Sequence, residues 1–143
     1  MRDMTQTEII NFIQYFTWGT LIGVEGDRPY AVELSYGFDG NYIYCGSMPG
    51  GRMARCIRDN ANVVFKICEC DWSYSRFRAV IVEGHAERMI SRDDIMKAVV
   101  QIARQRELPD QAFAGVVDRL VDNPHSNSLR IAVTTVGGKI AGY

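Results

Sequence analysis

Residues 30–45 decide the fold, and they read YAVELSYGFDGNYIYC. Two stretches rich in aromatic and aliphatic residues flank Asp39-Gly40, and an Asp-Gly pair in that setting is a strong signal for a tight hairpin turn. Residues 17–25 form another strand candidate, which a turn at 26–29 joins to the first of these stretches. Three strands joined by two tight turns predict an antiparallel meander.

The rest of the chain adds strands and short helices without a regular strand–helix alternation. Gly84 lies in the middle of the longest strand candidate and predicts a bulge or a bend at a barrel corner. About six strands and four short helices predict one domain over residues 1–143, a mainly β antiparallel barrel decorated with helices. Apolar periodicity and end signals place the helices over about 5–16, 52–59, 92–105 and 109–121, and the later strands over 63–68, 76–89 and 129–135, before a short terminal strand.

The composition fits a globular protein and excludes several other classes. The 143 residues are 47% hydrophobic and 23% charged, which excludes intrinsic disorder, a collagen triple helix and a coiled coil as the overall structure. Sixteen basic and seventeen acidic residues leave a net charge of −1, which disfavours a strongly basic nucleic-acid-binding protein. No apolar run approaches the roughly 18 residues of a membrane span, and the start lacks the apolar core of a signal peptide. We therefore expect a cytoplasmic protein with no membrane or nucleic-acid partner.

Four cysteines raise the question of disulfides or metal. Cys45, Cys56, Cys68 and Cys70 contain no Cys-x-x-Cys spacing. Cys68 and Cys70 share one face of a predicted strand, which is too crowded for a standard zinc site. We expect reduced cysteines that pack as small apolar groups and no metal, with zinc or redox chemistry as the alternative.

The clearest chemical pattern lies at residues 44–55, which read YCGSMPGGRMAR. The order is strand, glycine-rich loop and helix start. A helix N-terminus offers free N–H donors and the positive end of the helix dipole, which favours a phosphate. Ser47 adds a hydroxyl group and Arg52 a fixed positive charge. The pattern predicts an anion site, and a plain strand–helix connection is the alternative.

Five arginines form two groups that could extend this site. Arg52, Arg55 and Arg58 recur every three residues along the predicted helix and share one side of it. Arg76 and Arg78 alternate onto one face of the long strand. Either the two groups are solvated cationic faces, or they line a shared anion pocket.

Other chemical signals are weak. The sequence contains no legible Ser-His-Asp arrangement and no pair of glutamates at metal-binding helical spacing. We interpret His85 and His125 as structural or surface residues. Trp72, Tyr74 and Phe77 could stack on a ring or a base, but aromatic residues more often belong to a core or an interface.

Short motifs distributed along the chain resemble a known family. They are Ala31–Gly37, Asp39–Tyr44, Gly51-Arg52, Asn60–Phe65, Ala79–Glu87, Leu129–Ile131 and Gly138-Lys139. In this order they resemble the pyridoxamine 5′-phosphate oxidase-like split-barrel flavoproteins, with the nitroimidazole-reductase (nitroimidazole-resistance) type as the nearest branch. The resemblance covers roughly residues 15–90 and 127–140.

The resemblance implies a six-stranded antiparallel split barrel that forms a homodimer, with FMN in the cleft between the subunits. The strand at 32–36 would run beside the isoalloxazine ring, and residues 46–53 would hold the phosphate. The implied cofactor-binding residues are Glu33, Leu34, Ser35, Gly46, Ser47, Gly51, Arg52 and Met53. Arg55 and Arg78, one from each arginine group, are further candidates.

The chain also departs from the family pattern. Met53 stands where many relatives have a lysine, and Arg55 is the candidate to replace that charge. Gly46 stands where the nitroimidazole-reductase type often has a histidine, and Ala79 where a polar residue is common. The C-terminal tryptophan and arginine motif of the oxidase has no counterpart, so oxidation of vitamin B6 is not expected.

The function implied by the resemblance is that of an FMN-dependent oxidoreductase that reduces a small molecule, as nitroreductases do. The cofactor would carry the electrons, which fits the lack of an acid–base set. The alternatives are a non-catalytic binding protein for flavin, deazaflavin or haem, and a nucleic-acid-binding barrel, which the net charge disfavours.

Overall fold

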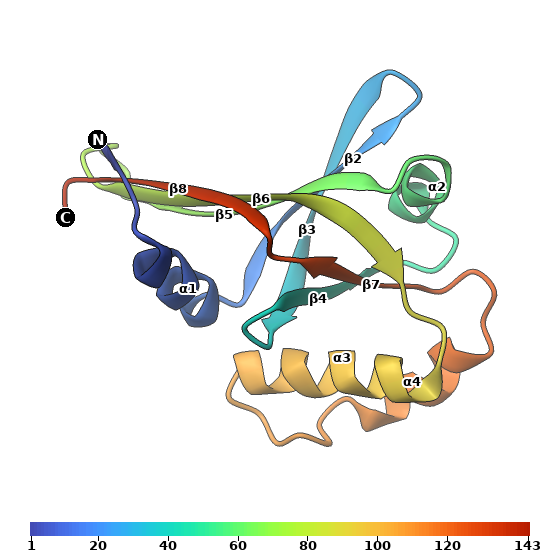
Figure 1. The fold of residues 1–143 in the computed structure, drawn as a ribbon. Coiled ribbons are helices and arrows are strands. Elements are labelled where there is room, and N and C mark those ends of the chain that lie inside the picture. Colours follow the sequence, from blue (N-terminus) through green and yellow to red (C-terminus); the bar gives the residue numbers. More distant parts are fainter.

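The computed structural model describes residues 1–143 and contains eight strands and four helices (Figure 1). None of the helices has the length and apolar character that a membrane crossing requires. In chain order the elements are β1 (Arg2–Asp3), α1 (Gln6–Tyr15), β2 (Trp18–Glu25), β3 (Arg28–Phe38), β4 (Tyr42–Ser47), α2 (Arg52–Asp59), β5 (Asn62–Cys70), β6 (Phe77–Arg88), α3 (Arg92–Gln105), α4 (Ala114–Val121), β7 (Asn127–Ala132) and β8 (Thr135–Ala141).

Six of the strands close into an antiparallel barrel. Their order is β6–β5–β2–β3–β4–β7, and the pairing of β7 with the second half of β6 closes the ring. β8 pairs with the first half of β6, and the two-residue β1 pairs with β8, so these strands extend the barrel on one side (Figure 1). The expected six-stranded antiparallel barrel is confirmed, with β1 and β8 added to it.

β6 contributes to both sides of the barrel because it changes partner near Gly84. Residues 77–83 pair with β8, whereas residues 86–88 pair with β7. Pairing with β5 continues through Gly84 without an extra residue, so β6 has no bulge there. A Cβ atom on Gly84 would lie 2.8 Å from Cγ2 of Ile131, so only glycine fits where the strand passes over the barrel core. Of the two predicted alternatives, the corner is present and the bulge is not.

α1 packs against the barrel core. Its start has the capping box that the sequence contains: the N–H of Glu8 donates to the Thr5 hydroxyl at 3.2 Å, and the N–H of Thr5 donates to the Glu8 carboxylate at 2.9 Å. Ile9, Phe12 and Ile13 are buried in the same apolar cluster as the inward residues of the strands. The amphipathic helix is therefore held by its end signal and by burial of one face.

α3 covers the outer face of β3 and β4, and α4 packs against α3 (Figure 1). They enclose a second apolar cluster that includes Tyr44, Ile95 and Val117. Gly37 lets the helix backbone lie directly on the strand, because a Cβ atom there would be 2.4 Å from the carbonyl carbon of Gln101.

The fourth helix is shorter than the sequence predicts. It begins at Ala114 instead of residue 109, because hydrogen bonds from Ala112 to Pro109 and from Ala114 to Gln111 fold the preceding segment into turns. Glu107 has a positive φ of 58°, which starts this reversal of the chain. The residues between α3 and α4 are therefore used to turn the chain back.

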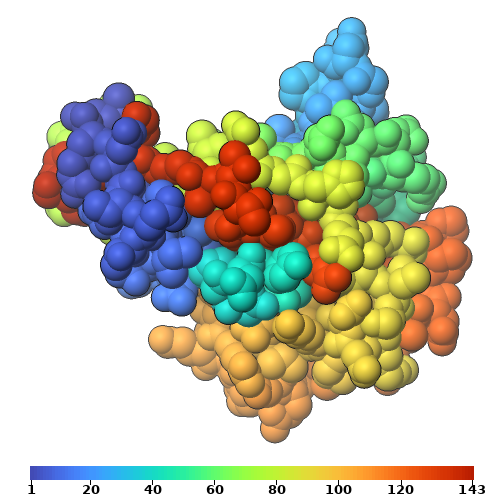
Figure 2. All heavy atoms as spheres, in the orientation of Figure 1, coloured from blue at the N-terminus to red at the C-terminus, as the bar shows by residue number.

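The outer face of β2, β5 and β6 is left open. Trp18 and Ile81 lie on this face and are exposed by 56% and 44%. Figure 2 shows two parts that project from the body: the light-blue β2–β3 hairpin, and the end of the β5–β6–β8 sheet beside both termini. The barrel thus has one face closed by helices and one face available for contact.

Candidate functional site

The loop between β4 and α2 carries the donors predicted for an anion. Gly51 is the N-cap of α2, and no side chain caps the helix. The first hydrogen bond within the helix runs from the N–H of Arg55 to the carbonyl of Gly51, at 3.1 Å. The N–H groups of residues 52–54 therefore have no partner inside the helix. This is the donor arrangement that binds anions at helix N-termini.

A second loop, residues 123–127, holds the first one in place. The N–H of Gly50 donates to the carbonyl of His125 at 2.9 Å, and Nδ2 of Asn127 donates to the hydroxyl of Ser47 at 2.6 Å. Gly50 has a φ of +67°, which favours glycine at this turn. Ser47 can still donate its own hydroxyl proton, so its position suits an anion held by residues 46–52.

Arg88 and Asn127 support the site, and no sequence pattern predicts either of them. Nε of Arg88 donates to the carbonyl of Ser126 at 2.7 Å, and one of its Nη atoms donates to that of Pro124 at 2.9 Å. These partners are 38 and 36 residues away, and Ser47 is 80 residues from Asn127. No local sequence signal marks such contacts. Only the structure reveals them, through the burial of the polar side chain of Asn127, which is 4% exposed.

Arg52 and Arg55 flank the loop on the surface. The guanidinium of Arg52 lies 3.2 Å from the Glu25 carboxylate and 4.2 Å from the centre of the Tyr30 ring. Nη1 of Arg55 is 3.4 Å from the carbonyl of Gly50. Arg52 is therefore already oriented by a carboxylate, and a phosphate group would compete with Glu25 for it.

Gly46 and Met53 have different places at this loop. Gly46 is exposed at the end of β4. The Met53 side chain is only 2% exposed, and its Sδ atom lies 3.1 Å from where a Cβ atom on Gly23 would be. Met53 can therefore reach a ligand only with its backbone N–H group.

Arg78 lies far from this loop within one chain. It faces Glu69 near the far end of β5, whereas α2 leads into the start of that strand. Nε of Arg78 donates to Glu69 at 3.0 Å, and its guanidinium stacks 4.5 Å from the ring centre of Tyr143. Arg76 stacks on the same ring at 4.3 Å. The two arginine groups therefore do not form a shared pocket within a single chain.

The β3 residues predicted beside the ring alternate between the two faces of the sheet. Leu34 packs against the barrel core. Glu33 and Ser35 stand on the outer face, where the hydroxyl of Thr20 donates to the Glu33 carboxylate at 2.9 Å. Strand pairing adds Trp18 beside Ser35. Trp18 and Thr20 are not predicted as site residues from the sequence, because only the pairing of β2 with β3 brings them beside Ser35 and Glu33.

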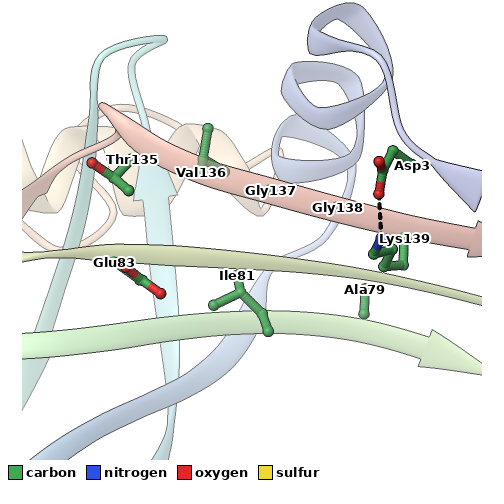
Figure 3. Close-up of a pocket in the computed structure, with 9 residues that line it drawn as sticks. All are labelled: Asp3, Ala79, Ile81, Glu83, Thr135, Val136, Gly137, Gly138 and Lys139. Atoms are coloured by element: carbon green, nitrogen blue, oxygen red, sulfur yellow. Dashed lines mark hydrogen bonds and ion pairs between the residues drawn. The ribbon is translucent and has the colours of Figure 1, made fainter.

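Two hollows lie on the open face, away from the predicted residues. One has a volume of about 410 Å³ and lies along β6 and β8, and Ile81 and an ion pair between Asp3 and Lys139 are among the groups that line it (Figure 3). The other, of about 710 Å³, reaches β2 and includes His85. None of the ten predicted cofactor-binding residues lines either hollow. Of the predicted residues of the loop and of β3, Met53 is buried and the others are exposed or partly exposed, outside both hollows.

The cysteines and histidines supply no catalytic or metal constellation. Cys45 and Cys56 are buried as predicted, whereas Cys68 and Cys70 are exposed on β5, which differs from the expectation of packed thiols. Burial raises the pKa of the Cys45 thiol to about 12, so it is no nucleophile at neutral pH. No group of three or more His, Cys, Asp and Glu residues could hold a metal ion.

Trp72, Tyr74 and Phe77, which could stack on a ring or a base, lie at the β5–β6 turn. Trp72 is 99% exposed, and the rings of Tyr74 and Phe77 stack with centres 5.5 Å apart. Asp71 organises the turn: the N–H of Arg76, then the hydroxyl groups of two neighbouring serines, donate to its carboxylate and lower its pKa to about 2. This turn is remote from the loop at residues 46–52.

Comparison with known proteins agrees with the resemblance in the sequence. The family model for pyridoxamine 5′-phosphate oxidase matches residues 5–140. An uncharacterised protein of Rhizobium meliloti is 35% identical over 89 residues, which cover 62% of this chain and 58% of that protein's length.

Solved structures share the fold at low sequence identity. An FAD-binding protein from Mesorhizobium loti is 22% identical with a TM-score of 0.69, over 99% of this chain and 97% of that one. A candidate 5-nitroimidazole antibiotic resistance protein from Bacteroides thetaiotaomicron is 16% identical with a TM-score of 0.80, over 97% and 86%. The FAD-binding protein from Mycobacterium smegmatis is 15% identical with a TM-score of 0.70, over all of both chains.

Proposed function

Because the chain belongs to the pyridoxamine 5′-phosphate oxidase family, we propose that it binds FMN and is a flavin-dependent oxidoreductase acting on a small molecule. The observation that carries this proposal is the loop at residues 46–52. It ends in a helix with uncapped N–H groups and has two arginines at its surface.

The donors present at this loop suit a phosphate monoester. The free N–H groups of residues 52–54, the hydroxyl of Ser47 and the guanidinium groups of Arg52 and Arg55 are all donors, and two of them carry a charge. A doubly charged phosphate accepts several such bonds at once. In this proposal the N–H groups and Ser47 orient the phosphate, and the arginines neutralise it.

The ring would lie along β3, where Glu33 and Ser35 face outward. FMN, when bound, supplies the electron transfer. The residues of the chain hold the phosphate, place the ring on the sheet and exclude water from one of its faces. No side chain is required as a nucleophile, which agrees with the buried thiol of Cys45.

We further propose that two copies of the chain enclose the cofactor. Apart from Met53, the predicted residues of the loop and of β3 are exposed or partly exposed and line neither hollow, and the neighbouring sheet face exposes Trp18 and Ile81. A second copy would cover this face and supply the other wall of the cleft. The location that we propose for this dimer is the cytoplasm.

The first experiment is an absorption spectrum of the purified protein, followed by calorimetry with FMN, FAD and riboflavin. We expect a yellow protein, or a colourless one that binds FMN more tightly than riboflavin, since riboflavin lacks the phosphate. A protein that binds none of the three would refute the proposal.

A second experiment separates an enzyme from a carrier. Loaded protein is mixed with NADH or NADPH without oxygen, and the flavin absorbance is followed. Bleaching of the flavin followed by its reoxidation with a nitroaromatic compound is the result expected of an oxidoreductase. Flavin that stays oxidised with both donors would favour a binding protein without turnover.

A further inference from the structure

Trp18 is exposed in a part of the sheet where exposure is unusual for so large an apolar side chain. It is 56% exposed, although it is the first residue of a central barrel strand. The chain has two tryptophans, and the other, Trp72, stands at a hairpin turn remote from the loop at residues 46–52. Exposed aromatic rings on regular elements are typical of surfaces that bind something.

The backbone around Trp18 is fixed, so the direction of its side chain is fixed as well. The N–H of Tyr36 donates to the carbonyl of Thr17 at 3.1 Å, which extends the β2–β3 pairing past Trp18. A Cβ atom on the next residue, Gly19, would lie 2.5 Å from the Phe65 ring, so Gly19 faces the packed core. Because neighbouring strand residues face opposite sides, Trp18 faces outward.

Strand pairing places Trp18 near the start of the loop at residues 46–52. Trp18 lies opposite Ser35, and the next residue of β3, Tyr36, lies opposite Cys45, which directly precedes Gly46. Neighbouring strands are about 4.8 Å apart, so the Cα atoms of Trp18 and Gly46 are separated by about 10 Å across β3. A ribityl chain bridges a gap of this size to a phosphate held at the start of the loop, by Ser47. Arg52, at the end of the loop, lies beside Glu25 at the opposite end of β2.

We infer that Trp18 stacks on the isoalloxazine ring of the cofactor and forms one wall of its site. The inference rests on the proposed flavin binding and goes beyond it, since it names the side chain that contacts the ring. An indole and a flavin are both flat and apolar on their faces, so stacking removes apolar surface from water on both sides. The pair of Thr20 and Glu33 then offers polar contacts beside the stacked ring.

The test uses the two indole N–H groups of the full-length protein as reporters. Nitrogen-15 NMR spectra are recorded during titration with FMN, and the Trp72→Phe variant assigns the two signals. The flavin ring current should shift the Trp18 signal strongly and leave the Trp72 signal in place. Affinities are measured in parallel for Trp18→Ala and for Trp72→Ala as the matched control.

We expect Trp18→Ala to weaken FMN binding by about tenfold or more, in the range known for stacking of one base on an aromatic side chain. Trp72→Ala should bind as the wild type does. Trp18→Phe, which keeps a flat ring, should recover part of the affinity. The NMR result needs no variant at position 18, so a folding defect there would not obscure the outcome.

The outcomes separate this inference from the proposed function. If the wild type binds no flavin, the proposed function fails. If it binds FMN while the Trp18 signal stays fixed and Trp18→Ala keeps its affinity, the stacking inference alone is overturned. If Trp18→Ala dissociates a dimer without any flavin-dependent shift of the Trp18 signal, Trp18 is a contact between copies and the inference is likewise overturned.

Discussion

The two outer faces of the barrel differ in what covers them. Over β3 and β4, α3 lies so close that Gly37 has no room for a side chain. On the outer side of β2, β5 and β6 no helix packs, and Trp18 and Ile81 are exposed there. The first face is stabilised by contacts within the chain, whereas in the proposed function a ligand and a second copy cover the second. Mutations should therefore act on stability at the closed face and on binding at the open face.

The largest effect is expected at Gly37. A side chain there would overlap the backbone of Gln101 and Ile102, with distances of 2.4 to 2.6 Å, and backbone cannot rotate away. Gly37→Ala should lower the free energy of unfolding by about 3 kcal/mol, measured by urea denaturation. Gly115→Ala is the control, since nothing lies within 4 Å of its added methyl group. An equal loss in both variants would contradict the close contact between α3 and β3.

Gln105 joins the closed face to α1. The two N–H groups on its Nε2 atom are shared among three carbonyl oxygens at the end of α1, at 2.6 to 3.0 Å, and its Oε1 atom accepts from the N–H of Phe38 at 3.1 Å. Gln105→Ala should cost about 2 kcal/mol of unfolding free energy, because the freed groups regain water only in part. Gln111→Ala, which removes an exposed amide without such bonds, should be close to neutral. A neutral Gln105→Ala would show that α1 is held by its apolar face alone.

Local features of the fold could be predicted from the sequence, whereas long-range contacts such as those of Gln105 could not. The capping box at Thr5, the Asp39-Gly40 hairpin and the corner at Gly84 are local signals, and the structure contains all three. Gln105 reaches partners 67 to 92 residues away, and no local pattern encodes such a distance. The predicted length of α4 is wrong, because hydrogen-bonded turns after residue 109 take the place of the first helical turns.

The candidate site was predictable to a similar degree. Its loop is contiguous in sequence, so glycines, Ser47 and Arg52 were visible together. Asn127 and Trp18 come from other strands and enter only through pairing. Arg78 was placed with Arg52 by charge alone, and the length of β5 separates them within one chain.

Arg52, at the start of α2, should control affinity with little effect on stability. Arg52→Ala removes a charged donor from the phosphate and should weaken FMN binding by about tenfold to a hundredfold. Riboflavin binding should be unchanged, because that ligand has no phosphate. Calorimetry with both ligands checks this, and unfolding in urea should match the wild type closely. Equal losses for FMN and riboflavin would place Arg52 outside the phosphate site.

Glu25 gives a prediction of opposite sign and smaller size. Its carboxylate lies 3.2 Å from the Arg52 guanidinium, and both side chains are exposed, so this ion pair contributes little to stability. Glu25→Gln removes the competitor of the phosphate and should strengthen FMN binding about twofold to fivefold. The gain should shrink in 1 M salt, where screening acts on the order of 3 Å. Weaker FMN binding in this variant would mean that Glu25 positions Arg52 instead of competing for it.

The smallest effect is expected at Asp71, at the far end of the open sheet. The N–H of Arg76 and the neighbouring serine hydroxyls lower the pKa of the Asp71 carboxyl from 3.8 to about 2 in the folded chain. A lowered folded pKa stabilises the fold above the unfolded value, and this contribution is lost as the pH falls from about 4 to about 2. Asp71→Asn should therefore lose stability relative to the wild type at pH 6 and approach it at pH 2, as measured by thermal unfolding. Asp27→Asn is the control, since it removes a carboxylate from another exposed turn, the one before β3. A constant difference between Asp71→Asn and the wild type at both pH values would show that the side chain stabilises the turn by shape and not by charge.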